Sequence, residues 1–231
     1  MRIPVALLLI FFIAACRAPE QGLEQSVKPG INASFVKPDL DVDTYVQKFE
    51  GESREIFVAR HRIARAIGLA AGMEVADIGA GTGLFMDLMA QSVGPEGRLY
   101  CVDLAPKFIE HLKQRAATKK YLHVQVVQCT ERSVELPEHS VDAVFICDTY
   151  HHFEYPFTTM ATIHRALRPG GSLFLVDFER IPGVSREWLL KHVRAGKDVF
   201  TAEIEKSGFE LVEEVEVKGL KENYFLKFRR R

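Results

Sequence analysis

The chain has 231 residues, enough for one sizeable α/β domain with an extension and too few for two full-sized domains. Hydrophobic residues make up 47% and charged residues 26%, a balance typical of a globular protein and not of a disordered one. The 30 Lys and Arg residues nearly cancel the 31 Asp and Glu residues, so no broad basic surface for nucleic acid is expected.

The first 16 residues have the pattern of a signal peptide. Arg2 is followed by a mostly apolar run at residues 3–14 and then by small residues, and such a run is too short for a transmembrane helix. The ending IAAC at residues 13–16 resembles the lipobox of bacterial lipoproteins, which implies lipidation of Cys16. We therefore expect a membrane-anchored lipoprotein facing the periplasm or the cell exterior. The alternatives are an ordinary cleaved signal peptide, or a mis-assigned start codon on a cytoplasmic protein.

The segment after the leader, residues 17–40, predicts a flexible tether. It is poor in large apolar residues and contains three prolines and two glycines. The folded domain is then expected over residues 41–231. At its start, Ile56, Ile63 and Ile67 have helical spacing and predict an amphipathic helix over residues 44–69.

This first helix also contains side chains that could cover a ligand pocket. They are Phe49, Glu50 and Arg54, which precede a glycine-rich turn. The alternative is that Arg54 pairs with Glu50 at helical spacing and contacts no ligand.

Strand-like apolar runs alternate with helical stripes through most of the domain. Strands are expected at residues 75–78, 98–104, 122–129, 141–148 and 172–179. Because strands joined by helices pair in parallel, this order predicts an α/β fold with a largely parallel sheet. The last two runs, at residues 208–219 and 223–230, are separated by a short polar loop and predict an antiparallel hairpin at the sheet edge.

A glycine-rich turn follows the first expected strand in VADIGAGTG, residues 75–83. Gly79, Gly81 and Gly83 allow the backbone to turn tightly and to approach a ligand at the start of the next helix. Dinucleotide-binding turns have the spacing G-x-G-x-x-G and hold a pyrophosphate, whereas here the spacing is G-x-G-x-G and Asp77 precedes the first glycine. A carboxylate at this point would repel a pyrophosphate and would suit a ligand that carries an ammonium and a sulfonium group.

This acid-and-glycine motif resembles that of the class I S-adenosylmethionine-dependent methyltransferases, in particular small-molecule methyltransferases related to the quinone-biosynthesis C-methyltransferases. The run LRPGGSLFLVD at residues 167–177 and the terminal hairpin also resemble that family. The resemblance implies a Rossmann-like, doubly wound, mostly parallel seven-stranded sheet with a C-terminal antiparallel hairpin. It also implies S-adenosylmethionine as cofactor, a small-molecule methyl acceptor, a role for Asp77 at the methionine part of the cofactor, and backbone contacts from the three glycines.

Further cofactor contacts are expected where the second and third strands end. Asp103 lies 20 residues after the glycine turn, where an acid can bind both ribose hydroxyls, and Leu104 follows it. An NAD-binding protein would place an acid there too, so Asp103 does not separate the two classes. Thr130 and Glu131 occupy the position where the family contacts adenine, although the family often has a Gly-Asp pair there.

The end of the fourth strand supplies the candidate catalytic residues Asp148, His151 and His152. Methyl transfer depends mainly on alignment of the acceptor, and a base is needed only when the acceptor holds a proton. His151 or His152 could be that base, while Asp148 and Tyr150 would line the methyl-donor side. The alternative is that one histidine packs in the core and the other caps the next helix.

The region after the fifth strand carries the candidate substrate residues Asp177, Arg180, His192 and Arg194. Imidazole and guanidinium groups near Trp188 could bind an acidic or aromatic small molecule. Packing within the adjacent helix is the alternative.

No metal is expected from the spacing of cysteines and histidines along the chain. Cys101, Cys129 and Cys147 lie in or beside strands, and no zinc-binding spacing is present. The predicted function is an S-adenosylmethionine-dependent methyltransferase. The alternatives are a non-catalytic S-adenosylmethionine-binding protein and an NAD-dependent oxidoreductase.

Overall fold

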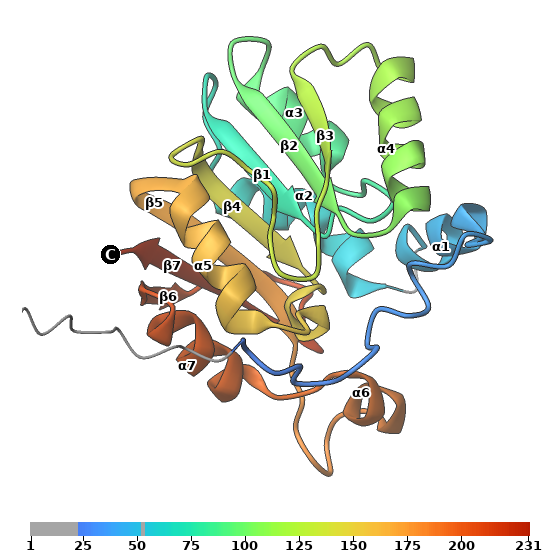
Figure 1. Cartoon of the computed structure of the whole chain (residues 1–231), viewed down its shortest axis with the longest axis vertical. Coiled ribbons are helices and arrows are strands. Elements are labelled where there is room, and N and C mark those ends of the chain that lie inside the picture. Colours follow the sequence, from blue (N-terminus) through green and yellow to red (C-terminus); the bar gives the residue numbers. More distant parts are fainter. Residues whose placement is uncertain (1–22, 52–53) are drawn as a thin grey trace, which may run out of the picture.

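The computed structural model describes residues 23–51 and 54–231, which fold around one seven-stranded sheet (Figure 1). The strands are β1 Glu74–Ile78, β2 Arg98–Asp103, β3 Val124–Gln128, β4 Val141–Cys147, β5 Leu167–Phe178, β6 Phe209–Glu214 and β7 Asn223–Arg230. Their order is β3-β2-β1-β4-β5-β7-β6. Strands β1 to β5 pair in parallel, while β7 is antiparallel to both β5 and β6. The predicted fold, including the terminal hairpin, is confirmed.

Helices cover both faces of the sheet (Figure 1). They are α1 Val42–Phe49, α2 Glu55–Ile67, α3 Met86–Val93, α4 Pro106–Thr118, α5 Pro156–Ala166, α6 Glu187–His192 and α7 Lys197–Lys206, with a 3-10 turn at Tyr150–His152. One apolar cluster joins α2, α3 and α4 to the sheet, and another joins α5 and α7 to the opposite face. The predicted stripe of α2 lies in the first cluster, where Ile56, Ile63 and Ile67 are buried.

The helix predicted over residues 44–69 is two helices in the structure. α1 ends at Phe49, and α2 begins at Glu55 after Gly51. Glycine is a poor helix former, which accounts for the break. The two helices pack against different parts of the domain. α2 packs on the sheet, whereas α1 packs its aromatic side chains on Phe108 of α4.

Residues 23–40, which we call the strap, lie within the region predicted as a flexible tether, but in the structure they pack on the domain. Figure 1 shows the strap in dark blue, passing from beside α5 to α1. The Glu24 carboxylate accepts hydrogen bonds from the backbone N–H groups of Phe157 and Thr158, at 3.0 and 2.7 Å, and so caps the start of α5. The Asn32 amide donates to the His152 carbonyl at 3.1 Å.

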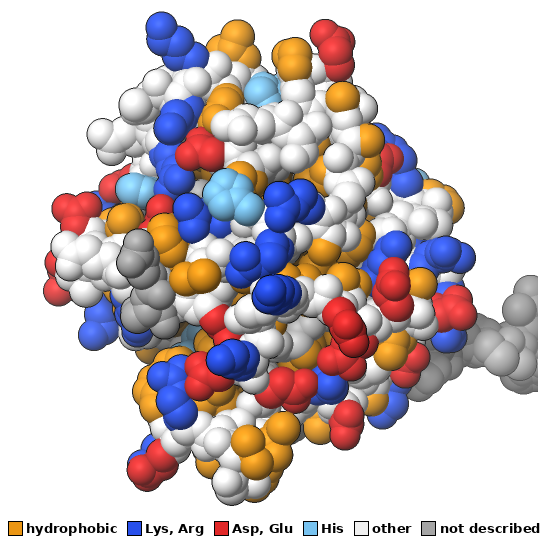
Figure 2. Space-filling view, turned by 180° about the vertical axis from the view of Figure 1, so that it is seen from behind, with side chains coloured by type: hydrophobic (Ala, Val, Ile, Leu, Met, Phe, Trp, Pro, Cys, Tyr) orange, Lys and Arg blue, Asp and Glu red, His pale blue; other side chains and the backbone are white. Residues whose placement is uncertain are grey.

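The leader predicted at residues 1–16, including Cys16, lies outside the described residues. Among the residues that the structure describes, no helix is long and apolar enough to cross a membrane. Basic and acidic side chains are intermixed on the face shown in Figure 2, in keeping with the formal net charge of −1.

Candidate active site

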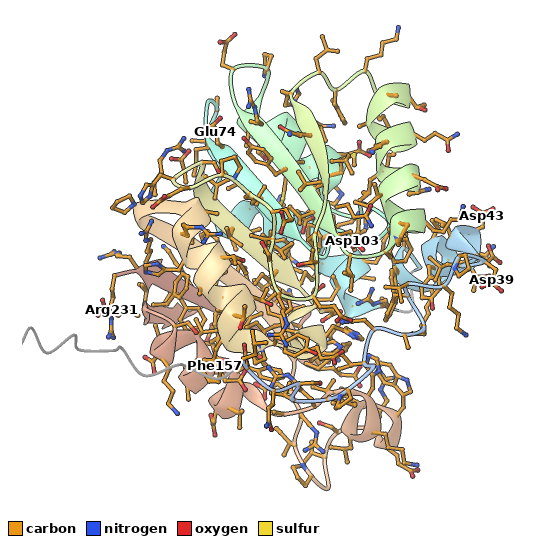
Figure 3. The ribbon with its side chains drawn as sticks, viewed as in Figure 1. Asp39, Asp43, Glu74, Asp103, Phe157 and Arg231 are labelled. Carbon is orange, nitrogen blue, oxygen red and sulfur yellow. The ribbon has the colours of Figure 1, made fainter. Side chains whose placement is uncertain are left out.

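A cavity of about 470 Å³ lies at the carboxyl ends of the parallel strands. This is the edge at which doubly wound sheets bind ligands, and the volume is that of a small-molecule site. Figure 3 shows Asp103 at this edge, on the side that faces α1. The strap, α1 and α6 contribute further side chains to the walls.

One part of the cavity, which we call the glycine half, is formed by the turn after β1 and the ends of β2 and β3. Its lining residues are Gly79, Gly81, Asp103, Leu104, Thr130 and Glu131. All six were predicted as cofactor contacts from the sequence.

The turn after β1 is held against the end of β2 by backbone hydrogen bonds. The Gly79 N–H donates to the Val102 carbonyl at 2.8 Å, and the Gly81 N–H donates to the Asp103 carboxylate at 2.8 Å. Gly79 has φ +76°, and a Cβ added there would lie 2.2 Å from a side-chain carbon of Thr149. Only glycine therefore fits at this position.

The acids of the glycine half are buried. Burial raises the pKa of Asp103 to about 6, although backbone N–H groups of Ala105 and Gly81 donate to it. Burial, and then the charge of Asp103, raise the pKa of Asp77 to about 7. Within the described part of the chain, no hydrogen bond stabilises the Asp77 carboxylate, so a cationic ligand nearby would stabilise its charged form.

Asp148 lies between the two parts of the cavity and is already paired. Arg54, directly before α2, donates to one of its oxygens, and the Asn223 amide donates to the other at 2.5 Å. Burial raises its pKa to about 6 despite the opposing effect of Arg54. Arg54 and Phe49 both line the cavity, in keeping with the expectation that side chains of this region cover a ligand pocket. Glu50 instead accepts a hydrogen bond from Arg115 at 2.9 Å.

The other part of the cavity, which we call the histidine half, contains His151, His152 and His192 with the rings of Phe178 and Trp188. Trp188 stacks on His192 with ring centroids 5.0 Å apart. The structure thus brings the two predicted catalytic histidines together with one predicted substrate residue.

His151 is held by the carboxylate of Asp177. Its Nδ1 lies 2.8 Å from Asp177 Oδ1, and its backbone N–H donates to Oδ2 at 3.2 Å. Both residues are buried, and His151 Nε2 lies 3.2 Å from His192 Nε2. Asp177, predicted as a substrate residue, therefore acts on the cavity through His151.

The other two histidines are held uncharged by their surroundings. Burial, and then the neighbouring His151, lower the pKa of His152 to about 2 and that of His192 to about 4. Neither ring therefore carries a charge near neutral pH.

Besides Asp177, the predicted site residues Tyr150, Arg180 and Arg194 do not line the cavity. The Tyr150 hydroxyl donates to Glu203 at 3.1 Å in the core, which argues against a cofactor contact. Arg194 donates to the same Glu203 at 2.8 and 2.6 Å. Arg180 donates to the carbonyls of Val193 and Leu190 at 2.9 and 3.0 Å. Both arginines hold α6 and α7 in place, and neither is available to a substrate.

Two predicted cofactor residues, Asp77 and Gly83, lie behind the cavity surface. A Cβ added to Gly83 would lie 3.0 Å from Leu112 of α4, so this glycine permits close packing of the turn on that helix.

Several cavity residues were not predicted, notably Asn223 of β7 and Asn32 and Phe35 of the strap. Asn223 directly follows a polar loop, and no local pattern marks it. The strap contains isolated apolar residues among polar ones, a pattern that also fits a tether.

The glycine half suits S-adenosylmethionine better than a dinucleotide. Asp103 retains free lone pairs for ribose hydroxyls, and Asp77, behind the cavity surface, provides a negative charge near the cationic methionine end. A pyrophosphate would meet Asp103 on the cavity wall, with Asp77 behind it. The fold and this site together define a Rossmann-like domain of the S-adenosylmethionine-dependent methyltransferase class.

Comparison with known proteins agrees with this class. A family model described as a methyltransferase domain matches residues 76–175. The ubiquinone/menaquinone biosynthesis C-methyltransferase UbiE of Bordetella parapertussis is 29% identical over 126 residues, which are 52% of this chain and 48% of that protein. The chain spans about half the length of the curated relatives it matches.

Solved structures show the same fold. A structure described as a SAM-dependent methyltransferase from Aquifex aeolicus matches with a TM-score of 0.72 at 22% identity, over 84% of this chain and 100% of that one. A protein described as a possible exported protein from Bordetella parapertussis matches with a TM-score of 0.60 at 14% identity, over 75% of this chain and 67% of that one.

Proposed function

We propose that the protein transfers a methyl group from S-adenosylmethionine to a small-molecule acceptor. The observation that carries this proposal is that one cavity joins an acid-and-glycine cradle to a wall of histidine and aromatic rings. The cofactor belongs in the glycine half, and the acceptor belongs in the histidine half.

In the glycine half, each polar group has a proposed partner on the cofactor. Asp103 binds the ribose hydroxyls, Asp77 supports the ammonium group, and Leu104, Thr130 and Glu131 lie against the adenine. The cofactor supplies an electrophilic methyl group, so the protein's main task is to hold the acceptor in line with it and to exclude water. The strap and Phe49 are placed to exclude water from above the cavity.

In the histidine half, the proposed acceptor is a small planar molecule with a hydroxyl or similar polar group. Flat rings of Phe35, Phe178 and Trp188 favour a planar ligand, and His151 and His152 are the polar groups that would contact it. The related quinone-biosynthesis methyltransferases support an acceptor of this shape.

The test is methyl transfer from isotopically labelled S-adenosylmethionine by the purified chain, using lipid and polar extracts and simple quinols and phenols as acceptors. We expect label in an extractable small molecule, and S-adenosylmethionine binding by calorimetry. Tighter binding of NADH than of S-adenosylmethionine would contradict the proposal. Cofactor binding without transfer to any acceptor would support a non-catalytic binding protein instead.

We also propose that the protein is exported and anchored to a membrane through lipid on Cys16. The leader at residues 1–16 supports this, and the fold is found in a protein described as possibly exported. S-adenosylmethionine is made in the cytoplasm, so an exported enzyme would need a supply of cofactor. Mass spectrometry of the native N-terminus should find a diacylated Cys16. An unlipidated chain that retains Met1 would contradict the anchor and place the protein in the cytoplasm.

A further inference from the structure

Three histidine side chains from two separate segments converge in the histidine half. His151 and His152 follow β4, and His192 ends α6. One ring nitrogen of each lies within 4.8 Å of one ring nitrogen of the other two. Three imidazole nitrogens this close together could serve as ligands of one metal ion.

The closest pair already has the spacing of two zinc ligands. Zn–N bonds of 2.0–2.1 Å at a tetrahedral angle place two ligand nitrogens about 3.3 Å apart. The Nε2 atoms of His151 and His192 are 3.2 Å apart. The other nitrogen–nitrogen distances are at most 4.8 Å, so a tetrahedral site requires the rings to rotate toward one another.

The surroundings of His151 are those of a metal ligand. Asp177 Oδ1 lies 2.8 Å from its Nδ1, so the proton sits on Nδ1 and the lone pair of Nε2 points toward His192. A carboxylate behind a ligating histidine orients the ring and strengthens it as a donor. Asp177 is fully buried, and its charge would partly neutralise a bound cation.

The surroundings of His152 also indicate a missing partner. Its Nδ1 is buried, and among the described residues no group forms a hydrogen bond with it. Unpaired buried nitrogens are costly. The Lys28 ammonium, which lies beside this cluster, donates to the carbonyls of His192 and Lys191 at 2.9 and 3.3 Å.

We propose that His151, His152 and His192 bind one divalent transition-metal ion, with Asp177 as the positioning residue behind His151. Three imidazoles favour zinc or a similar borderline metal and disfavour magnesium and calcium, which prefer oxygen ligands. Three protein ligands leave a fourth position, as in catalytic zinc sites, and all three histidines line the cavity. Sequence spacing did not indicate this site because the third ligand comes from α6.

The role of the metal rests on the proposed function. Its fourth position would hold a hydroxyl, phenolic or thiol group of the acceptor beside the cofactor, and would lower the pKa of that group. Coordination uses the Nε2 lone pair of His151 that a general base would need. Metal binding and the predicted base role of His151 therefore exclude each other.

The test is direct metal binding by the untagged chain after treatment with a chelator. Zn²⁺ is titrated by calorimetry, and Co²⁺ by the rise in visible absorption when the ion leaves six-coordinate water. We expect one ion per chain. His192→Ala and His152→Ala should each weaken binding at least 100-fold, and Asp177→Asn by 10–100-fold. His61→Ala, at an exposed position on α2, is the matched control and should bind as the wild type does.

Circular dichroism and thermal unfolding identify any variant that fails to fold, and His192→Ala is the most informative because this residue is only half-buried. Absence of stoichiometric binding by the wild type, or unchanged binding by folded His192→Ala and His152→Ala, would overturn the site. S-adenosylmethionine is titrated into the same samples. If the wild type binds the metal but does not bind S-adenosylmethionine, the proposed function is rejected and the metal site remains supported.

Discussion

The two halves of the cavity are built in different ways. The glycine half consists of backbone and acids at the ends of adjacent strands, so the sheet itself fixes its geometry. The histidine half draws on the strap, the turn after β4, the end of β5 and α6, which are held together by side-chain hydrogen bonds. We infer that the cofactor site is rigid and that the acceptor site can change with its loops.

The halves also differ in charge. The glycine half contains buried carboxyl groups whose pKa values are raised by burial, whereas His152 and His192 in the histidine half have lowered pKa values. The first half is therefore suited to a cation, and the second to a neutral planar molecule.

The largest effect is expected from Asp103→Ala. The change removes the proposed acceptor for the ribose hydroxyls and the acceptor for the Gly81 N–H, and hydrogen bonds to a charged group contribute about 1.5–3 kcal/mol each. Affinity for S-adenosylmethionine should fall by roughly 10²–10³-fold in calorimetry. Glu110→Ala, an exposed acid on α4, is the control. An Asp103→Ala variant that binds as the wild type does would contradict the cofactor placement.

Gly79→Ala should destabilise the fold because its Cβ would overlap Thr149 and because alanine is strained at φ +76°. We expect a loss of roughly 3 kcal/mol and a fall in Tm of about 6–12 °C in thermal unfolding. Gly170→Ala is a matched control, since Gly170 has φ +75° with nothing within 4 Å of an added Cβ. It should lose only about 1 kcal/mol. Equal losses would show that contact with Thr149 does not restrict the turn.

Asp77→Asn should raise stability and lower cofactor affinity at the same time. In the folded protein the pKa of Asp77 is raised to about 7, whereas the unfolded chain ionises this group near pH 4. The wild type therefore loses stability as the pH rises from about 4 to 7, and the variant avoids this loss. We expect Asp77→Asn to be more stable by on the order of 2 kcal/mol at pH 8, with no gain near pH 4.

The same ionisation gives a pH dependence for the wild type. Calorimetry should show tighter S-adenosylmethionine binding at pH 8 than at pH 6, and this difference should shrink in Asp77→Asn. An equal gain in stability at both ends of the pH range would mean that ionisation of Asp77 is not its cause.

Glu24→Ala should have the smallest effect and should be confined to the histidine half. The change removes the two hydrogen bonds that hold the strap to the start of α5. Together they stabilise the docked position of the strap by about 1 kcal/mol. Hydrogen exchange of residues 27–36 should accelerate, while exchange of β1 and β2 stays unchanged. If the strap already exchanges fast in the wild type, the segment is a flexible tether, as the sequence predicted, and is not docked on the domain.

The fold and the glycine half were predictable from sequence because their signals are local. Each buried strand is a short apolar run, and the acid and glycines of the turn lie within seven residues from Asp77 to Gly83. The α5 cap by Glu24 was not predictable, since its partners are backbone N–H groups 133 and 134 residues away.

The roles of neighbouring side chains in the histidine half were also beyond the sequence. Tyr150 and His151 are adjacent, yet the 3-10 turn directs one toward Glu203 in the core and the other toward Asp177 and the cavity. Arg180 and Arg194 have the chemistry of ligand-binding residues, but their partners within the fold were not visible in the sequence. The residue types in the sequence identified the segments that form the histidine half. Only the tertiary structure shows which of their side chains face the cavity.

Hydrogen exchange with and without S-adenosylmethionine tests the division of the cavity most directly. We predict slower exchange in peptides that cover residues 79–83, 103–105 and 129–131, with a much smaller change in α6. Protection of α6 with no change at residues 79–83 would contradict the account, because the cofactor would then occupy the histidine half.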